Sequence, residues 1–193
     1  MKRAFVLGNG KSRLKTDLNL LKTKGRVYGC NALYRDFHPD VLIAVDPKMV
    51  IEICQANYQL EHEVWTNPNK QYRDFKKLNF FSNPRGWSSG PTALLRACMD
   101  HCDEIYILGF DYHSSDGKFN NVYASTFNYK ASTSSATYFG NWMKQTETIM
   151  REYPRINFFR VNGDDPIYFN EWKMINNFKD MNYEILHRLI EAY

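Results

Sequence analysis

A glycine-bracketed turn near the start of the chain is the first place where residue types and spacing suggest chemistry. The apolar run at positions 3–7 continues directly into the sequence GNGKS. α/β proteins bind phosphates with such a strand–turn–helix segment, because glycine lets backbone N–H groups approach a ligand closely. We expect a phosphate or a base to bind Gly8, Asn9, Gly10 and Ser12. The turn lacks both the P-loop spacing and the third glycine of a dinucleotide fingerprint, so a tight turn without a ligand is the alternative.

A second apolar run ends in a glycine and a carboxylate. Residues 104–108, Glu-Ile-Tyr-Ile-Leu, are followed by Gly109, and Asp111, Tyr112 and His113 come shortly after it. Histidine and carboxylate side chains are common partners in proton transfer. We therefore expect Asp111 and His113 to be catalytic, and the alternative is a loop histidine with no such role.

Two further polar residues follow predicted strands. Asn31 comes directly after the strand at 25–30, and Asp46 ends the apolar strand at 41–45. The amide of Asn31 can bind a sugar or a phosphate, and Asp46 can bind ribose hydroxyls or a metal. The alternative for each residue is to cap the helix that follows it.

The segment from Arg85 to Gly90 combines a fixed cation with two hydroxyls before a predicted helix. We expect Ser88, Ser89 and Gly90 to form a second site for an anion and Arg85 to stabilise a departing phosphate. The serines can instead be ordinary helix caps.

Strand-length and helix-length segments alternate along the chain. The predicted strands cover residues 3–7, 25–30, 41–46, 63–66, 78–81, 105–108 and 156–161. The predicted helices cover residues 12–22, 48–58, 92–101 and 137–151. This alternation predicts an α/β fold of the Rossmann-like type, with a mostly parallel sheet and helices on both faces. In such a sheet the candidate residues meet at the carboxyl edge.

The chain is expected to form one nucleotide-binding domain over residues 1–165, with a mobile loop over 112–136 and a helical C-terminal tail over 166–193. The loop is rich in Ser, Asn and Tyr and shows little periodicity. The tail is rich in aromatic residues and can pack on its own domain or on another subunit, so a homo-oligomer is one expected outcome.

Composition excludes several classes of protein. The 193 residues carry a net charge of +4, which is too mild to indicate nucleic-acid binding. The four cysteines form no CxxC pair, and no set of residues has zinc-like spacing, so we expect free thiols, a cytoplasmic location and no metal site. No apolar run reaches the 18 residues of a membrane span, so no integral membrane segment is expected.

The motifs in their order resemble two related groups of enzymes: the bacterial sialyltransferases of glycosyltransferase family 42 and the 6-hydroxymethylpterin pyrophosphokinases of the MptE type. The pieces that are similar to the sialyltransferases are the LGNGKS turn, Cys30-Asn31, the Ser88–Gly90 turn and the strand that ends GFDY. The stretch HPDVLIAVDP, at positions 38–47, is closer to the pyrophosphokinase-like group. The resemblance covers roughly residues 3–160 in motif order.

The sialyltransferase resemblance implies that Asn9, Asn31 and the turn at 88–90 bind a nucleotide donor. It also implies that two tyrosines hold the donor phosphate, for which Tyr112 and Tyr123 are the candidates. Thr137 stands where the family has its histidine base, and threonine is no base near neutral pH. Asp111 or His113 would then take that role, or the chemistry differs.

These observations together predict a nucleotide-dependent transferase, and most specifically a sialyltransferase-like glycosyltransferase that uses a donor similar to a CMP-sugar and an unknown acceptor. Such a reaction does not require Mg²⁺. A pyrophosphokinase-like enzyme, with Mg²⁺ held by Asp46 and Asp111, is the second possibility. A nucleotide-binding protein without catalytic activity is the third.

Overall fold

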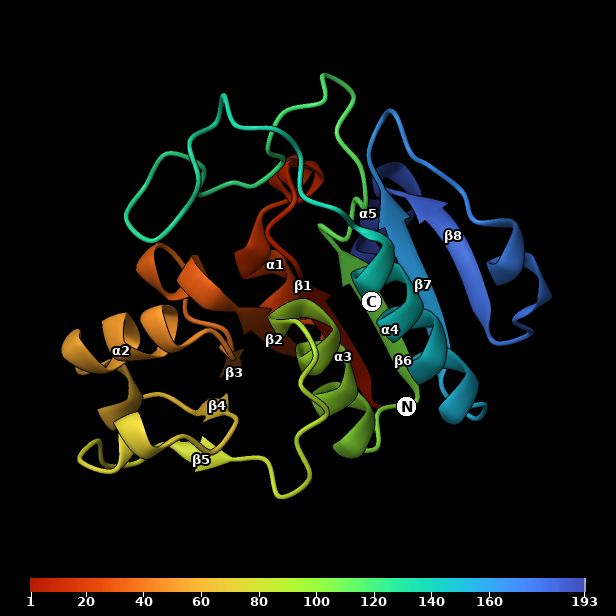
Figure 1. The fold of residues 1–193 in the computed structure, drawn as a ribbon. Helices are drawn as coiled ribbons and strands as arrows, with labels where there is room; N and C mark the ends of the chain where they lie inside the picture. The colour runs from red at the N-terminus through yellow and green to blue at the C-terminus, as the bar shows by residue number, and fades with distance from the viewer. Residues whose placement is uncertain (193) are drawn as a thin grey trace.

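The protein folds around one sheet of eight strands, in a computed structural model that describes residues 1–192 (Figure 1). The strand order is β5-β4-β3-β2-β1-β6-β7-β8, and every neighbouring pair is parallel. The strands are β1 (Arg3–Leu7), β2 (Arg26–Cys30), β3 (Val41–Ile43), β4 (Val64–Thr66), β5 (Asn79–Phe80), β6 (Glu104–Leu108), β7 (Asn157–Asn162) and β8 (Phe178–Asn182). The predicted Rossmann-like α/β class is confirmed.

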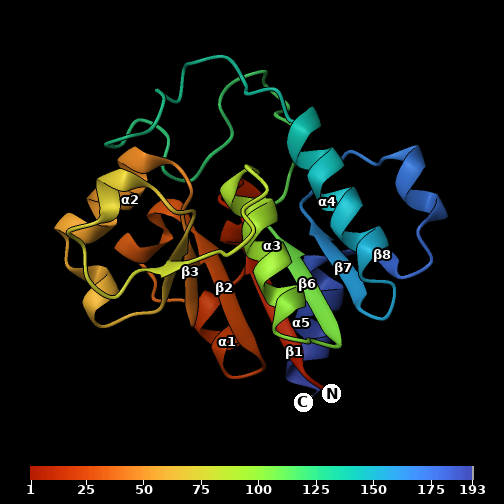
Figure 2. The same cartoon turned by 60° about the horizontal axis from the view of Figure 1, so that its bottom comes forward.

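Helices cover both faces of the sheet, because successive side chains of each central strand point to opposite sides. The helices are α1 (Leu18–Lys22), α2 (Pro47–Gln55), α3 (Ser89–Met99), α4 (Gly140–Glu152) and α5 (Tyr183–Glu191). Phe5 and Leu7 of β1 share a buried cluster with residues of α1, α2 and α5. Val6 belongs to a second cluster with residues of α3 and α4, which lie together on one face in Figure 2.

The chain reverses its direction of travel across the sheet at β1. The first strands step outward from β1 to β5, and the chain then crosses back to place β6 on the other side of β1. Connections on opposite sides leave a crevice at the carboxyl edge of the sheet, where α/β proteins bind their ligands. The fold therefore directs attention to the space between the ends of β1 and β6.

The predicted helix over residues 12–22 is wrong, since two short helices occupy this stretch. A 3-10 helix covers Lys11–Lys15, and α1 begins only at Leu18. Asp17 separates the two, because its carboxylate accepts a hydrogen bond of 2.9 Å from the backbone N–H of Asn19 and so caps α1. The turn at Gly10 therefore leads into a single short 3-10 helix.

The expectation of a purely helical tail after residue 165 is also corrected. The tail contains a 3-10 helix (Asn170–Met174), the strand β8 and then α5; Tyr193 lies outside the described residues. β8 pairs with the outer edge of β7, which places the tail in the same sheet as the rest of the chain. The buried Arg160 of β7 donates from Nε to Asp180 of β8 at 2.9 Å, and this pair helps to join the two strands.

A long connection between β6 and α4 crosses the carboxyl edge of the sheet, and we call residues 109–139 the crossing loop. It contains one isolated bridge, between Lys118 and Ser135, and otherwise no strand or helix. The predicted loop at 112–136 is therefore confirmed as a loop, and its mobility stays a prediction. Among residues 1–192, no helix has the length and apolar character needed to span a membrane.

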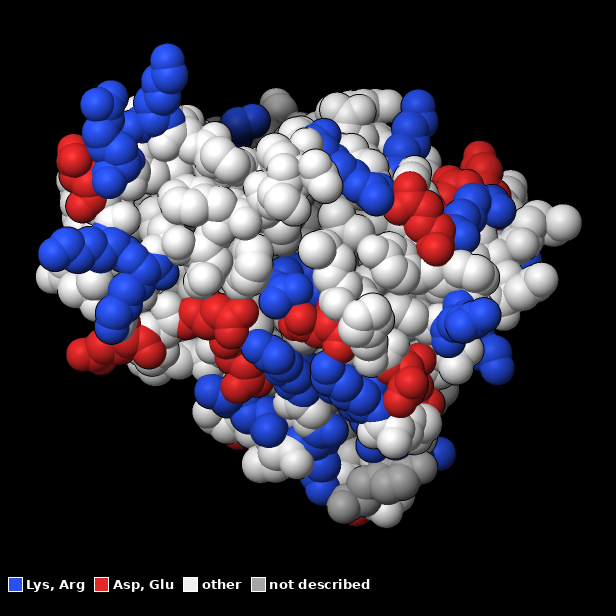
Figure 3. Space-filling view, turned by 90° about the horizontal axis from the view of Figure 1, so that it is seen from below, with Lys and Arg blue, Asp and Glu red and all other residues white. Residues whose placement is uncertain are grey.

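Charged side chains of both signs are interleaved on the side of the molecule that faces away from the crossing loop (Figure 3). Several of them form ion pairs near the amino ends of the strands. Arg26 pairs with Glu63 at 3.0 Å, and Arg96 pairs with Asp100 at 2.8 Å. This face therefore presents no continuous surface of one sign. The four cysteines are buried and free, as their spacing predicts.

Candidate functional site

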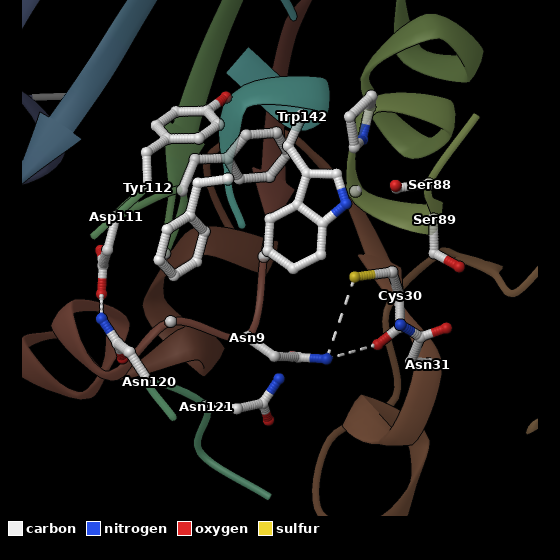
Figure 4. A pocket seen from close by; sticks show the side chains of 17 residues that line it. Asn9, Cys30, Asn31, Ser88, Ser89, Asp111, Tyr112, Asn120, Asn121 and Trp142 are labelled. Atoms are coloured by element: carbon white, nitrogen blue, oxygen red, sulfur yellow. Dashed lines mark hydrogen bonds between the residues drawn. The ribbon is translucent and has the colours of Figure 1, made fainter. Parts of the chain in front are cut away.

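A pocket lies at the carboxyl edge of the sheet, between the ends of β1 and β6 (Figure 4). Its walls come from the turn after β1, the end of β2, the start of α3, the crossing loop and the start of α4. Of the residues predicted from the sequence, it brings together Gly8, Asn9, Gly10, Asn31, Ser88, Ser89, Gly90, Asp111 and Tyr112. We call it the switch-point pocket.

The backbone of the turn after β1 is directed at the protein itself, which differs from the expected phosphate cradle. The N–H of Gly10 donates to the carbonyl oxygen of Gly109 at 3.0 Å. The N–H of Lys11 donates to Asn120 Oδ1 at 2.9 Å, and that of Ser12 donates to Asp111 Oδ2 at 3.2 Å. These donors therefore have protein acceptors and join the end of β1 to the end of β6.

The glycines of this turn are needed for the approach of two backbones. A Cβ on Gly8 would lie 2.6 Å from the carbonyl oxygen of Gly109, and one on Gly10 would lie 2.5 Å from Asp111 Oδ2. A Cβ on Gly109 would meet the carbonyl oxygen of Gly8 at 2.5 Å, and Gly109 also has a φ of +70°. Close packing of β1 against β6 thus explains the glycines without a ligand.

Asp111 holds this junction together. Its carboxylate accepts hydrogen bonds from the backbone N–H and the hydroxyl of Ser12 and, at 3.0 Å, from Asn120 Nδ2. A carboxylate at this position repels a phosphate bound at the same N–H groups. The residue links the turn to the crossing loop, which is a structural task in addition to any catalytic one.

An amide oxygen without a hydrogen-bond partner belongs to Asn9, a residue of the pocket lining. Asn9 is 7% exposed, and its Nδ2 donates to the carbonyl oxygen of Cys30 at 3.0 Å. That bond fixes the orientation of the amide, so the atom left without a hydrogen-bond partner is the acceptor Oδ1. Asn31 Oδ1 is a second buried acceptor without a partner, on a residue with a φ of 55°. Since unsatisfied buried acceptors are costly, both oxygens are suited to a ligand that donates hydrogen bonds.

Cys30 also lines the pocket but is not an activated nucleophile. Burial raises the pKa of its thiol to about 12, an effect that the charge of Arg13 opposes. The thiol therefore stays protonated near neutral pH, and its sulfur donates to the carbonyl oxygen of Leu7 at 3.5 Å.

The start of α3, which the sequence predicts to be an anion site, uses some of its polar groups to bind the protein itself. The hydroxyl of Ser89 accepts from the N–H of Val45 at 3.1 Å, and the N–H of Ser88 donates to Gln145 Oε1 at 3.1 Å. The N–H groups of Ser89 and Gly90 lie in the first turn, where a helix offers no acceptor four residues earlier. They are backbone donors that a ligand in this pocket can use.

Aromatic side chains form the wall that sequence reasoning missed. Phe110, Phe139 and Trp142 line the pocket, and the rings of Phe139 and Trp142 meet edge to face with centroids 5.6 Å apart. Figure 4 shows the indole of Trp142 above Asn9 and beside Ser88. A tryptophan near the start of the helix predicted at 137–151, next to the long polar loop, was the available signal. Asn120 and Asn121 of the crossing loop complete the lining and carried no such signal.

The two tyrosines expected to hold a phosphate have other partners. Tyr112 lines the pocket, but its buried hydroxyl lies 2.6 Å from Thr146 Oγ1, and burial raises its pKa. Tyr123 is outside the pocket lining; its hydroxyl donates to Asp36 at 2.7 Å and accepts from Arg13 at 3.1 Å. Neither hydroxyl is arranged to receive a phosphate.

Arg85 and Asp46 also lie apart from the switch-point pocket. Arg85 pairs with Glu152 at 2.8 Å and stacks over Trp87, with 4.7 Å from its guanidinium carbon to the ring centre. Among the described residues that line the pocket, none is a lysine or an arginine. Asp46 caps α2 by accepting a hydrogen bond of 2.9 Å from the N–H of Lys48, which is the helix-cap alternative given for it above.

His113 and Ser12 line a neighbouring cavity, together with Lys11 and Lys15. This cavity and the switch-point pocket share Asp111 and Asn120 as a common wall. His113 Nε2 lies 2.7 Å from the carbonyl oxygen of Asp165. A carbonyl only accepts, so Nε2 carries the proton of the neutral ring and Nδ1 is the acceptor.

Comparison with models of protein families, with curated proteins and with solved structures finds no match for this chain. What the site can do therefore follows from its residues and their geometry. The pocket combines an aromatic wall, buried amide acceptors and free N–H donors at a helix start. Within residues 1–192, no group of three or more His, Cys, Asp or Glu side chains is arranged to hold a metal ion.

Proposed function

We propose that this chain is a nucleotide-dependent transferase that binds the nucleoside part of its donor in the switch-point pocket. The observation that carries the proposal is the pairing of Asn9, whose buried Oδ1 has no hydrogen-bond partner, with the indole of Trp142 in the lining of one pocket. Nucleobases have a flat face that stacks on aromatic rings and amino groups that donate to amide oxygens. A nucleobase therefore satisfies both features at once.

The donor phosphate is expected at the start of α3. The N–H groups of Ser89 and Gly90 and the hydroxyl of Ser88 are the donors available there. Helix starts favour anions, and donors aimed at a leaving phosphate stabilise the negative charge that it gains in the transition state. This arrangement replaces the role first expected for Arg85.

Polar side chains also lie beside the switch-point pocket, beyond Asn31. A second cavity, lined by Asn31, Asp46, Lys48, Asn128 and Tyr129, shares that asparagine with the switch-point pocket. Its carboxylate, amide and hydroxyl groups are suited to the hydroxyls of a sugar. Polar groups beside a nucleotide pocket favour a reaction with hydroxyl-bearing substrates and so a nucleotide-activated sugar as the donor, in line with the sialyltransferase resemblance.

The pyrophosphokinase-like alternative has less support. It needs Asp46 and Asp111 to share one Mg²⁺, but the two carboxylates line different cavities. Asp111 is also bonded to Ser12 and Asn120, and Asp46 caps α2. We therefore favour glycosyl transfer over phosphoryl transfer.

Titration calorimetry of the purified chain against CMP, UDP, GDP and ATP tests the proposal. We expect one of them to bind with a Kd below about 1 mM, a value that corresponds to roughly −4 kcal/mol. An absence of binding to all four at millimolar concentration would contradict the proposal.

His113 is the base that we propose for the transfer step. Its Nδ1 takes the proton from the O–H of an acceptor or a water while that oxygen bonds to the anomeric carbon of the sugar. The bond between that carbon and the phosphate oxygen breaks, and its electron pair leaves with the phosphate. His113→Gln keeps a donor for the carbonyl of Asp165 but removes the base. We expect about a 100-fold loss in the rate of nucleotide release from the bound nucleotide sugar, with unchanged affinity.

The control is His101→Gln, which changes an exposed histidine that lines neither cavity. A His113→Gln variant that releases nucleotide at the wild-type rate would remove His113 from the mechanism. If the wild-type chain binds a nucleotide sugar and never turns it over, a binding protein without catalytic activity becomes the better description.

A further inference from the structure

Hydrogen bonds hold the tip of the crossing loop beside the switch-point pocket. The crossing loop runs from the end of β6 toward the region of α2 in Figures 1 and 2, and we call its residues 122–130 the loop tip. Val122 N–H donates to the carbonyl oxygen of Asn9 at 2.8 Å, directly beside the pocket. Asn128 Nδ2 donates to Glu52 Oε2 at 2.8 Å, on α2. The loop tip therefore bridges the two ends of the candidate donor site.

One side chain, that of Arg35, contributes two of the hydrogen bonds that hold the loop tip. Arg35 Nη1 donates to Thr126 Oγ1 at 2.8 Å, and Nη2 donates to the carbonyl oxygen of Phe127 at 2.9 Å. Its guanidinium also lies 5.8 Å from the ring centres of both Tyr123 and Tyr129. Arg35 thus contacts the loop tip through two hydrogen bonds and two aromatic faces.

Glu52 fixes the position of this guanidinium. Arg35 Nε donates to Glu52 Oε1 at 2.8 Å, and the hydroxyl of Tyr34 donates to the same oxygen at 2.7 Å. Burial alone would raise the pKa of Glu52, but hydrogen bonds from Tyr34, Arg35 and Asn128 outweigh burial and lower it. The carboxylate is therefore ionised near neutral pH, and a fixed pair of charges presents the remaining Arg35 donors to the loop.

Arg35 is also connected to the pocket through its own helix. The 3-10 helix Asn31–Arg35 begins at the pocket residue Asn31 and ends at Arg35. The N–H of Ala32, in the same helix, donates to the hydroxyl of Tyr129 at 3.3 Å. One short rigid element thus carries a pocket acceptor at its start and the anchor of the loop tip at its end.

We propose that Arg35 is a positioning residue that holds the loop tip against the Asn31–Arg35 helix and so keeps Asn120 and Asn121 in the wall of the donor site. Arg35 itself lines neither the switch-point pocket nor the cavity beyond Asn31. It acts through the loop, and its release opens the wall of the pocket. This inference rests on the proposed function for the identity of the ligand.

The test compares Arg35→Ala and Arg35→Lys with wild type and with Arg188→Ala, which removes an exposed ion pair to Glu184 on α5. Lysine keeps the charge next to Glu52 but lacks the planar fork that reaches Thr126 and Phe127 at the same time. Hydrogen exchange of peptides from the loop tip, and titration with whichever of the four nucleotides the wild type binds, are the two measurements.

We expect loop-tip amides to exchange about 10-fold faster in both Arg35 variants, while β1 and β6 keep their protection. Nucleotide affinity is expected to fall about 10-fold in both variants and to stay unchanged in Arg188→Ala. If Arg35 acts only as a structural charge, lysine restores both values, which overturns the proposal.

The proposal is also overturned if the loop-tip amides of the Arg35 variants exchange at the wild-type rate. Faster exchange together with wild-type nucleotide affinity overturns it as well. A failure of the proposed function is recognised separately, since the wild type then binds none of the four nucleotides. In that case the inference loses its ligand, and the exchange data alone decide whether Arg35 holds the loop.

Discussion

Alanine at position 109 is expected to lower the free energy of unfolding by about 3 kcal/mol or more. Gly109 has a φ of +70°, a region that costs an L-residue roughly 1–2 kcal/mol. The new Cβ would also lie 2.5 Å from the carbonyl oxygen of Gly8, and relief of such an overlap costs roughly a further 1–3 kcal/mol. Denaturant unfolding followed by circular dichroism measures the loss.

Variants at two other glycines separate the cost of the backbone conformation from the cost of the steric overlap. Gly117 has a φ of +68°, and no atom lies within 4 Å of the position that a Cβ would take there. Gly117→Ala therefore reports the backbone cost alone, about 1 kcal/mol. The Gly8→Ala variant places a Cβ 2.6 Å from the carbonyl oxygen of Gly109, which is too close for two non-bonded atoms. If Gly109→Ala is no less stable than Gly117→Ala, the ends of β1 and β6 do not pack as closely as the structure has them.

Removal of the indole at position 142 is expected to weaken nucleotide binding by roughly 10- to 100-fold, since stacking of one base on an aromatic ring contributes about 1–3 kcal/mol. Trp142 forms the wall opposite the amide of Asn9, in the first turn of α4. Trp142→Ala removes this surface, whereas Trp142→Phe keeps a smaller one. Calorimetric titration with the nucleotide that the wild type binds most tightly measures the affinity of both variants.

Trp65→Phe is the matched control, because Trp65 lies on β4, under Arg96, and lines none of the cavities described above. We expect it to bind nucleotide as the wild type does, and Trp142→Phe to fall between wild type and Trp142→Ala. Wild-type affinity in Trp142→Ala would mean that the base binds elsewhere, and the switch-point pocket would lose its proposed occupant.

Most of the sheet is readable from local patterns. Apolar runs such as 41–43 and 105–108 are typical of buried parallel strands, and their alternation with helical segments predicts the doubly wound class. β8 was missed because its five residues, Phe-Lys-Asp-Met-Asn, show no buried run. It is an edge strand, and its pairing with β7 is a contact between distant segments that local periodicity does not report.

The candidate site is likewise predictable from the sequence only in part. The sequence predicts that residues after parallel strands meet at the carboxyl edge of the sheet, and Asn9, Asn31 and Ser89 do meet there. The strand order of the structure then places the turn after β1 at the switch point. The partners of Arg85 and Tyr123 do not follow from sequence, because they come from Glu152 and Asp36, far along the chain. A residue type suggests which bonds a side chain can make, and only packing decides which of them it makes.

The glycine turn at 8–12 shows what each level of structure determines. The sequence alone determined that a strand ends there in a tight, glycine-dependent turn, since the apolar run and the glycines are local features. The tertiary structure decided that the N–H groups of Gly10, Lys11 and Ser12 bond to Gly109, Asn120 and Asp111. The physical reason is that β6 packs against β1 and brings its acceptors to those donors. The N–H groups of Ser89 and Gly90, at the start of α3, have no such acceptor from the helix.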